Sequence, residues 1–62
     1  MTAKFYSKDG IENSIEFKPD NEELFIFLKD ENCEIISIVL SKKNAQDLVI
    51  FLRGSFDIIP QV

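Results

Sequence analysis

The 62-residue sequence lacks histidine and tryptophan, and it has one cysteine, two glycines and two prolines. Without histidine the chain lacks the usual proton shuttle near neutral pH, and no Ser-His or Cys-His nucleophile can form. The single cysteine, Cys33, excludes an intrachain disulfide, and the missing histidines remove the common zinc sites. These absences predict that the protein is not an enzyme and binds no metal or cofactor.

The remaining reactive and metal-ligating candidates are weak. Acidic residues surround Cys33 on both sides, and their charge disfavours the thiolate, so we expect a buried or idle thiol. Carboxylates cluster at residues 20–23 and 30–32, where they could meet a hard cation such as calcium. Neither cluster has the spacing of an EF-hand loop or the glycine at its bend. We therefore interpret both clusters as solvated turns.

Charge and hydropathy limit the partners and the compartment. No apolar run is long enough for a signal peptide or a membrane span, and a lone thiol suits a reducing compartment. The net charge is −4, from eleven acidic and seven basic side chains. This balance weakens generic affinity for nucleic-acid backbones and anionic lipids. We expect a cytoplasmic protein for which nucleic acid and membranes are not the favoured partners.

The length and apolar content predict a single folded domain over residues 1–62. Hydrophobic residues make up 45% of the chain and include six phenylalanines, a composition that disordered segments lack. A core this small supplies only roughly 3–5 kcal/mol, and small domains usually add a disulfide, a metal or a partner subunit. The residue types disfavour the first two additions. A partner subunit is the one that remains.

Asp9-Gly10 predicts the first hairpin, between extended runs at residues 4–7 and 11–18. A two-residue loop would split the apolar side chains between the two faces. A three-residue loop over residues 8–10, with Gly10 in the left-handed conformation, instead collects them on one face. We therefore predict a face shared by Ala3, Phe5, Ile11, Ile15 and Phe17.

A second hairpin is predicted after the break at residues 19–21, between the apolar runs 24–28 and 35–40. Centring this hairpin on Asn32 aligns its apolar residues in two sets, one on each face. The first set is Leu24, Ile26 and Leu28 opposite Leu40, Ile38 and Ile36. The second set is Phe25 and Phe27 opposite Val39 and Ser37.

The last element is a helix that begins after Ser41 as N-cap and ends at Arg53, before Gly54 as the C′ residue. Its apolar stripe should cover the sheet face that carries Leu24 and Ile26. The stripe consists of Ala45, Leu48, Val49 and Leu52, whereas Ile50 and Phe51 lie off it. Residues 55–60 are again apolar, and we predict a last edge strand or a docked extension there.

The sequence thus predicts an α+β domain: a four-stranded antiparallel sheet of two hairpins, one C-terminal helix and a short apolar extended tail. One helix covers one face of a sheet, whereas this sheet is apolar on two faces. The tail, a second copy or a groove for another protein could cover the second face. We expect a non-enzymatic protein-interaction or regulatory module that forms a homodimer. Its predicted interface comprises Phe25, Phe27, Val39, Ile50, Phe51, Phe56 and Ile58.

Two alternative functions involve nucleic acid. Four strands followed by a helix that enters at Leu40-Ser41, with Phe25 and Phe27 alternating on a strand, resemble the outline of PC4-like and whirly proteins. That resemblance implies a dimer that binds single strands through its sheets. The basic residues are scattered among the acids, however, which favours core packing for the two phenylalanines. The second alternative is an acidic inhibitor or decoy of a nucleic-acid-binding protein, presenting Glu12, Glu16, Asp20, Glu22 and Glu23.

Overall fold

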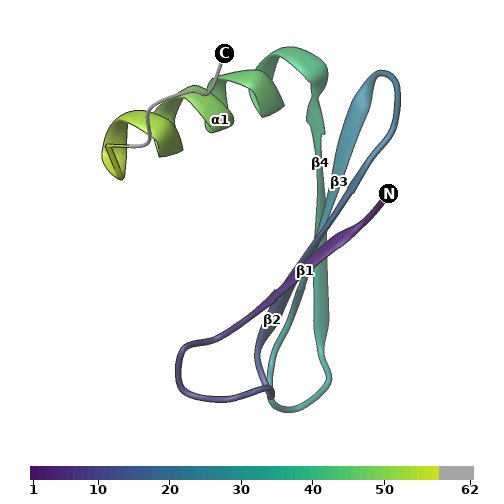
Figure 1. Cartoon of the computed structure of the whole chain (residues 1–62). Helices are drawn as coiled ribbons and strands as arrows, with labels where there is room; N and C mark the ends of the chain where they lie inside the picture. The colour runs from purple at the N-terminus through teal and green to yellow at the C-terminus, as the bar shows by residue number, and fades with distance from the viewer. Residues whose placement is uncertain (58–62) are drawn as a thin grey trace.

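The computed structural model describes residues 1–57, which form a four-stranded antiparallel sheet followed by one helix (Figure 1). The strands follow one another in the sheet in the order β1-β2-β3-β4. This architecture confirms the predicted α+β fold of two hairpins and a helix. Residues 58–62, with half of the tail predicted at residues 55–60, lie outside the described residues. The element bounds are β1 Ala3–Tyr6, β2 Ser14–Pro19, β3 Glu23–Lys29, β4 Ile35–Ser41 and α1 Lys42–Ser55.

The β3–β4 hairpin has the predicted register, with Ile26 opposite Ile38 and Leu24 opposite Leu40. Its turn is closed by Asp30, whose Oδ1 accepts the backbone N–H groups of Asn32 at 2.9 Å and Glu34 at 3.0 Å. An aspartate in this role holds a turn by replacing backbone hydrogen bonds. The hairpin therefore centres on Asn32, as the apolar pattern requires.

The break between β2 and β3 is also where the sequence predicts it. Asp20 follows Pro19, and its Oδ1 accepts the N–H groups of Glu22 and Glu23, both at 2.9 Å. The Asp20 N–H in turn donates to the Glu23 carbonyl at 2.9 Å. The carboxylate of Asp20 thus has a structural role in the turn.

The β1–β2 connection differs from the prediction. Phe5 lies opposite Ile15, and the Ser7 N–H donates to the Asn13 carbonyl at 2.9 Å. The predicted loop over residues 8–10 is therefore wrong, because the chain between the strands is longer and Ile11 lies exposed within it. The observed register is displaced by two residues, which keeps side chains on the same face because they alternate with period two. Phe5 consequently still shares a face with Ile15 and Phe17.

The register sorts the strand residues onto two faces. We call the face that α1 approaches the helix-side face and the opposite one the far face. The helix-side face carries Ala3, Phe5, Ile15, Phe17, Pro19, Leu24, Ile26, Leu28, Ile36, Ile38 and Leu40. The far face carries Lys4, Tyr6, Ser14, Glu16, Lys18, Glu23, Phe25, Phe27, Lys29, Ile35, Ser37 and Val39.

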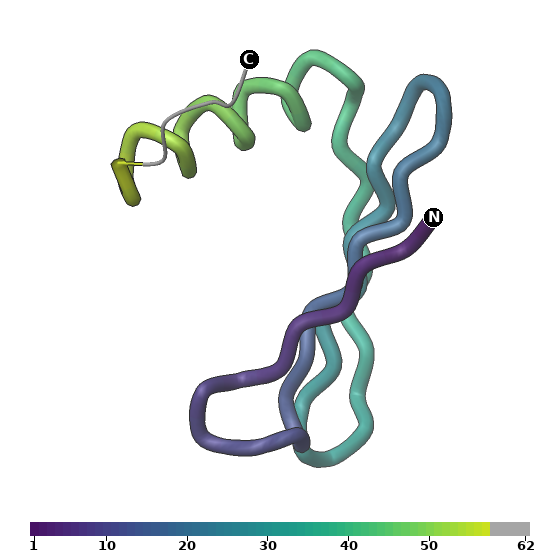
Figure 2. The backbone as a smooth tube through the Cα atoms, viewed as in Figure 1, coloured from purple at the N-terminus to yellow at the C-terminus, as the bar shows by residue number. Residues whose placement is uncertain are grey.

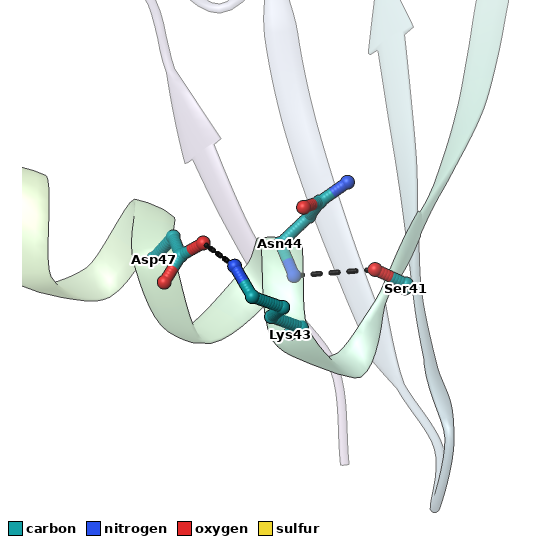
Figure 3. Close-up of polar contacts among 4 residues, drawn as sticks. All are labelled: Ser41, Lys43, Asn44 and Asp47. Atoms are coloured by element: carbon teal, nitrogen blue, oxygen red, sulfur yellow. Dashed lines mark hydrogen bonds and ion pairs between the residues drawn. The ribbon is translucent and has the colours of Figure 1, made fainter.

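Helix α1 begins as predicted, because the Ser41 Oγ accepts the Asn44 N–H at 3.2 Å and so caps the first turn (Figure 3). One turn later, the Lys43 Nζ contacts the Asp47 carboxylate at 2.9 Å (Figure 3). The predicted end at Arg53 is wrong, since the helix continues through Gly54 to Ser55. The left-handed residue after the helix is Asp57, with φ of 54°. Aspartate tolerates this conformation, so the helix does not need to stop at its glycine.

The helix extends away from the end of β4 instead of lying along the sheet (Figures 1 and 2). It contacts β3 and β4 among the strands. No loop separates β4, which ends at Ser41, from α1, which starts at Lys42, so the chain has no residues with which to fold the helix back. The predicted cover of the helix-side face is therefore only partial. Leu24 and Leu40 are half-buried, while Ile36 and Ile38 stay exposed.

Candidate self-association surface

One copy of the chain buries little of its apolar surface. Among the described residues only Ile26 is buried, with 5% of its surface exposed. The accessible surface is 5483 Å², whereas a compact monomer of 7.2 kDa is expected to expose about 4,100 Å². The radius of gyration is 13.2 Å, compared with about 11 Å for a compact domain of this length. The fold is therefore open, with an excess surface of about 1,400 Å².

Two depressions lie on the helix-side face. The first, of about 410 Å³, lies between the helix and the strand ends, where Phe17 and Leu24 meet Leu48 and Leu52. The second, of about 440 Å³, lies at the opposite end of the strands, and its apolar lining is Phe5, Ile15, Leu28 and Ile36. The rings of Phe5 and Phe17 join the two regions by an edge contact with centroids 6.0 Å apart. We call the two depressions, with the Phe5–Phe17 pair between them, the apolar trough.

The second half of the helix is apolar around most of its circumference. Leu48 is half-buried, but Leu52 is 40% exposed and Ile50 and Phe51 are each 66% exposed. We call residues 48–56 the helix arm; it also includes the exposed Phe56. A helix that is apolar all round is normally buried on all sides. One copy buries no residue of this segment, and only Leu48 is half-buried.

On the far face, lysine side chains lie next to aromatic rings. Phe25 and Phe27 are half-buried, and the Lys18 Nζ lies 5.1 Å from the centroid of the Phe27 ring. Tyr6 has the Lys4 Nζ 5.5 Å from its ring centroid. Lysine side chains can cover apolar surface with their methylene stems while the ammonium group stays in water. The far face therefore combines aromatic rings with charged side chains that shield them.

The structure places the predicted interface residues in two separate regions. Ile50, Phe51 and Phe56 lie exposed on the helix arm, whereas Phe25, Phe27 and Val39 lie on the far face. Ile58 lies outside the described residues. Sequence reasoning missed the exposed residues of the helix-side face, because it assumed that the helix covers them. These residues are Phe5, Leu28, Ile36 and Ile38.

Polar groups suited to chemistry do not gather in the part of the chain that the structure describes. Within residues 1–57, no three cysteine or acidic side chains are placed to share a metal ion. Cys33 is exposed and has φ of 63° in the turn before β4. Over the same residues, the helix is too short and too polar to cross a membrane. The dominant surface feature is thus the apolar trough with its helix arm.

Comparison with known proteins gives no further guide: no protein-family model, no curated protein and no solved structure matches the chain.

Proposed function

We propose that this chain is a non-enzymatic protein-interaction module that works as a homodimer. Each copy covers the helix-side face of the other with its helix arm. The observation that carries the proposal is the set of exposed apolar side chains in these two regions. They are Phe5, Leu28, Ile36 and Ile38 on the helix-side face and Val49, Ile50, Phe51, Leu52 and Phe56 on the helix arm. Exposed apolar patches of this extent mark association sites.

The amount of excess surface fits a dimer. A standard interface buries about 800 Å² on each partner, and obligate homodimers bury a total of about 2,000–5,000 Å². The excess of about 1,400 Å² per copy gives about 2,800 Å² for two copies, within the range for obligate homodimers. The missing stability of a single copy is then supplied by the subunit contact.

A second copy also fits the arrangement of the two regions. Each chain carries both an apolar face and an apolar arm, so one two-fold axis pairs both arms with both faces. The helical residues of the arm, 48–55, span about 12 Å, which is shorter than the roughly 23 Å spanned by the seven residues of β4. The arm is therefore short enough to lie on the face of the sheet, and both surfaces are mainly apolar.

Sedimentation of Phe51→Lys and Asn44→Lys tests this function. Both substitutions add one positive charge to an exposed position on α1, but only Phe51 lies on the helix arm. Burial of a phenylalanine side chain contributes about 1.5–3 kcal/mol, and two-fold symmetry counts each change twice. Phe51→Lys should therefore raise the dimer dissociation constant about 10²–10⁴-fold, while Asn44→Lys should leave it unchanged. Equal behaviour of both variants, or a monomeric parent protein, would contradict the proposal.

A second candidate function concerns the far face, where the register brings lysines and aromatic rings together. Single-stranded nucleic acid binds surfaces that combine stacking rings with positive charge. Two glutamates, Glu16 and Glu23, share this face and oppose that use. Titration of a labelled oligonucleotide at low salt tests it: binding that Lys18→Glu abolishes would support the candidate, and no binding would remove it. The lysines and rings are Lys4, Lys18 and Lys29 with Tyr6, Phe25 and Phe27.

A further inference from the structure

The two edges of the sheet differ in how well they are protected. The β1 edge is four residues long, and its Lys4 side chain lies over Tyr6. The β4 edge is seven residues long and contains only isoleucine, valine, leucine and serine. Natural proteins guard free edges with short strands, charges, prolines or bulges. Over residues 35–41 the β4 edge has no charge and no proline, and β3 is its only strand neighbour in the described sheet.

The hydrogen-bond pattern identifies which backbone groups of β4 are free. The Asp30 N–H donates to the Glu34 carbonyl at 3.1 Å, and the Lys42 N–H donates to the Glu22 carbonyl at 3.0 Å. Antiparallel ladders alternate between bonded and non-bonded pairs. Ile36, Ile38 and Leu40 therefore direct their backbone groups toward β3. The residues between them, Ile35, Ser37 and Val39, direct theirs toward the open edge.

The side chains along this edge are exposed on both faces of the sheet. Ile36 and Ile38 are exposed on the helix-side face, and Ile35 and Val39 are exposed on the far face. A strand without a neighbour on one side exposes its side chains in this way. By contrast, β3 is paired on both sides, and its Phe25, Ile26 and Phe27 are buried or half-buried. Both the backbone and the side chains of β4 therefore lack a neighbouring strand.

We propose that this edge pairs in antiparallel fashion with the same edge of another copy, centred on Ser37. Ser37 then faces Ser37 of the other copy, and Ile35 faces Val39 in both directions. These pairs use the outward-facing backbone groups that the alternation leaves free. The same register sets Ile36 beside Ile38, so every cross-strand pair within residues 35–39 is either apolar or serine with serine, while Leu40 falls opposite Glu34. Such pairs stabilise sheets, and no like charges meet.

This contact uses the edge of the sheet, whereas the homodimer of the proposed function uses its helix-side face, and Ile36 and Ile38 border both surfaces. Both contacts are isologous, which means that each joins a surface to its own copy. Together they produce a closed tetramer, a dimer of dimers, when their two-fold axes are perpendicular. The edge contact joins two four-stranded sheets into one of eight strands.

Ser37→Pro tests the edge contact without removing a hydrogen bond from the chain's own sheet. Proline lacks the N–H, and at position 37 that group faces the open edge, where strands tolerate proline. Ser37→Thr is the matched control because it keeps the N–H and favours strands. Under the full proposal, light scattering finds a tetramer for the parent protein and Ser37→Thr, and a dimer for Ser37→Pro.

The other outcomes separate the two proposals. A parent dimer that Ser37→Pro splits into monomers supports the edge contact and overturns the helix-arm dimer. A parent dimer that Ser37→Pro leaves intact overturns the edge contact and leaves the helix-arm dimer standing. A monomeric parent overturns both.

Amide hydrogen exchange of the parent protein gives a readout that does not depend on whether the proline variant folds. The outward N–H groups of Ile35, Ser37 and Val39 should exchange slowly in concentrated protein and faster on dilution, since the contact that protects them is lost. The inward N–H groups of Ile36 and Ile38 serve as the internal control. Fast exchange of the outward amides at every concentration, beside protected inward amides, would overturn the edge contact.

Discussion

The two faces of the sheet differ in what covers their apolar side chains. On the far face, Phe27 lies beneath Lys18, and the neighbouring charged residues keep that face compatible with water. On the helix-side face, the charged strand residues that line the trough are Glu23 and Lys29, one at each end, and α1 reaches only one end of it. The helix-side face exposes Phe5, Leu28, Ile36 and Ile38, whereas the far face exposes Tyr6, Ile35 and Val39 among lysines and glutamates. The sequence predicts that the helix covers the helix-side face, but in the structure the helix covers this face only in part.

This difference is the reason for assigning the proposed dimer contact to the helix-side face. A face with interspersed lysines can remain in water, because lysine stems cover apolar surface and ammonium groups stay hydrated. Exposing a face of isoleucine, leucine and phenylalanine to water is unfavourable in proportion to its exposed apolar area. In the proposed homodimer the second subunit therefore covers the helix-side face, although the sequence alone directs attention to Phe25 and Phe27 on the far face.

The largest expected effect comes from placing the same charge on either face of β1. Phe5 on the helix-side face is 56% exposed, and Tyr6 on the far face is 54% exposed. Phe5→Lys should raise the dimer dissociation constant about 10²–10⁴-fold, because each of two symmetric copies loses about 1.5–3 kcal/mol of burial. Tyr6→Lys should have little effect on dimerisation. Sedimentation equilibrium measures both, and a larger effect for Tyr6→Lys would reverse the assignment of the faces.

The next effect concerns the small interior of one copy. Ile26→Ala removes the one buried side chain of the described residues, and such truncations cost about 2–5 kcal/mol. A core of this size supplies only roughly 3–5 kcal/mol, so the variant should be largely unfolded when dilute. Urea unfolding followed by circular dichroism measures this cost. Ile11→Ala, in the exposed β1–β2 loop, is the control and should remain folded.

The smallest effect is a gain in stability within the helix arm. Gly54 lies inside α1, and a Cβ built at this position meets no atom within 4 Å. Gly54→Ala should therefore raise the free energy of unfolding by about 0.5–1 kcal/mol, because alanine favours the helix and restricts the unfolded chain. Urea unfolding at fixed protein concentration measures the change. A loss of stability would mean that the helix ends before Gly54, as the sequence pattern suggests.

Local patterns explain which parts of the fold could be predicted from the sequence. The β3–β4 register follows from apolar residues on both faces, and the helix start follows from Ser41 as a cap. The β1–β2 loop could not be predicted, because Asp9-Gly10 also fits a longer connection and Ile11 resembles a strand residue. Gly10 has φ of 155° there, a conformation that only glycine adopts readily.

The exposed part of the helix-side face could not be predicted from local patterns, because it depends on tertiary geometry. Periodicity identifies the apolar stripe of α1, but it does not fix the angle at which the helix leaves β4. That angle is limited by the direct junction of Ser41 and Lys42, which leaves no loop for the helix to fold back. The exposed positions on the helix-side face can therefore be identified only from the orientation of α1 relative to the sheet.

The most direct test of self-association is the stability of the unmodified protein as a function of its concentration. When folding is completed by a second subunit, dilution favours the unfolded chain by mass action. The urea midpoint, followed by circular dichroism, should therefore rise steadily as the protein concentration increases, and sedimentation should find a dimer or a larger assembly. A stable, folded monomer whose urea midpoint does not change with concentration would contradict this result.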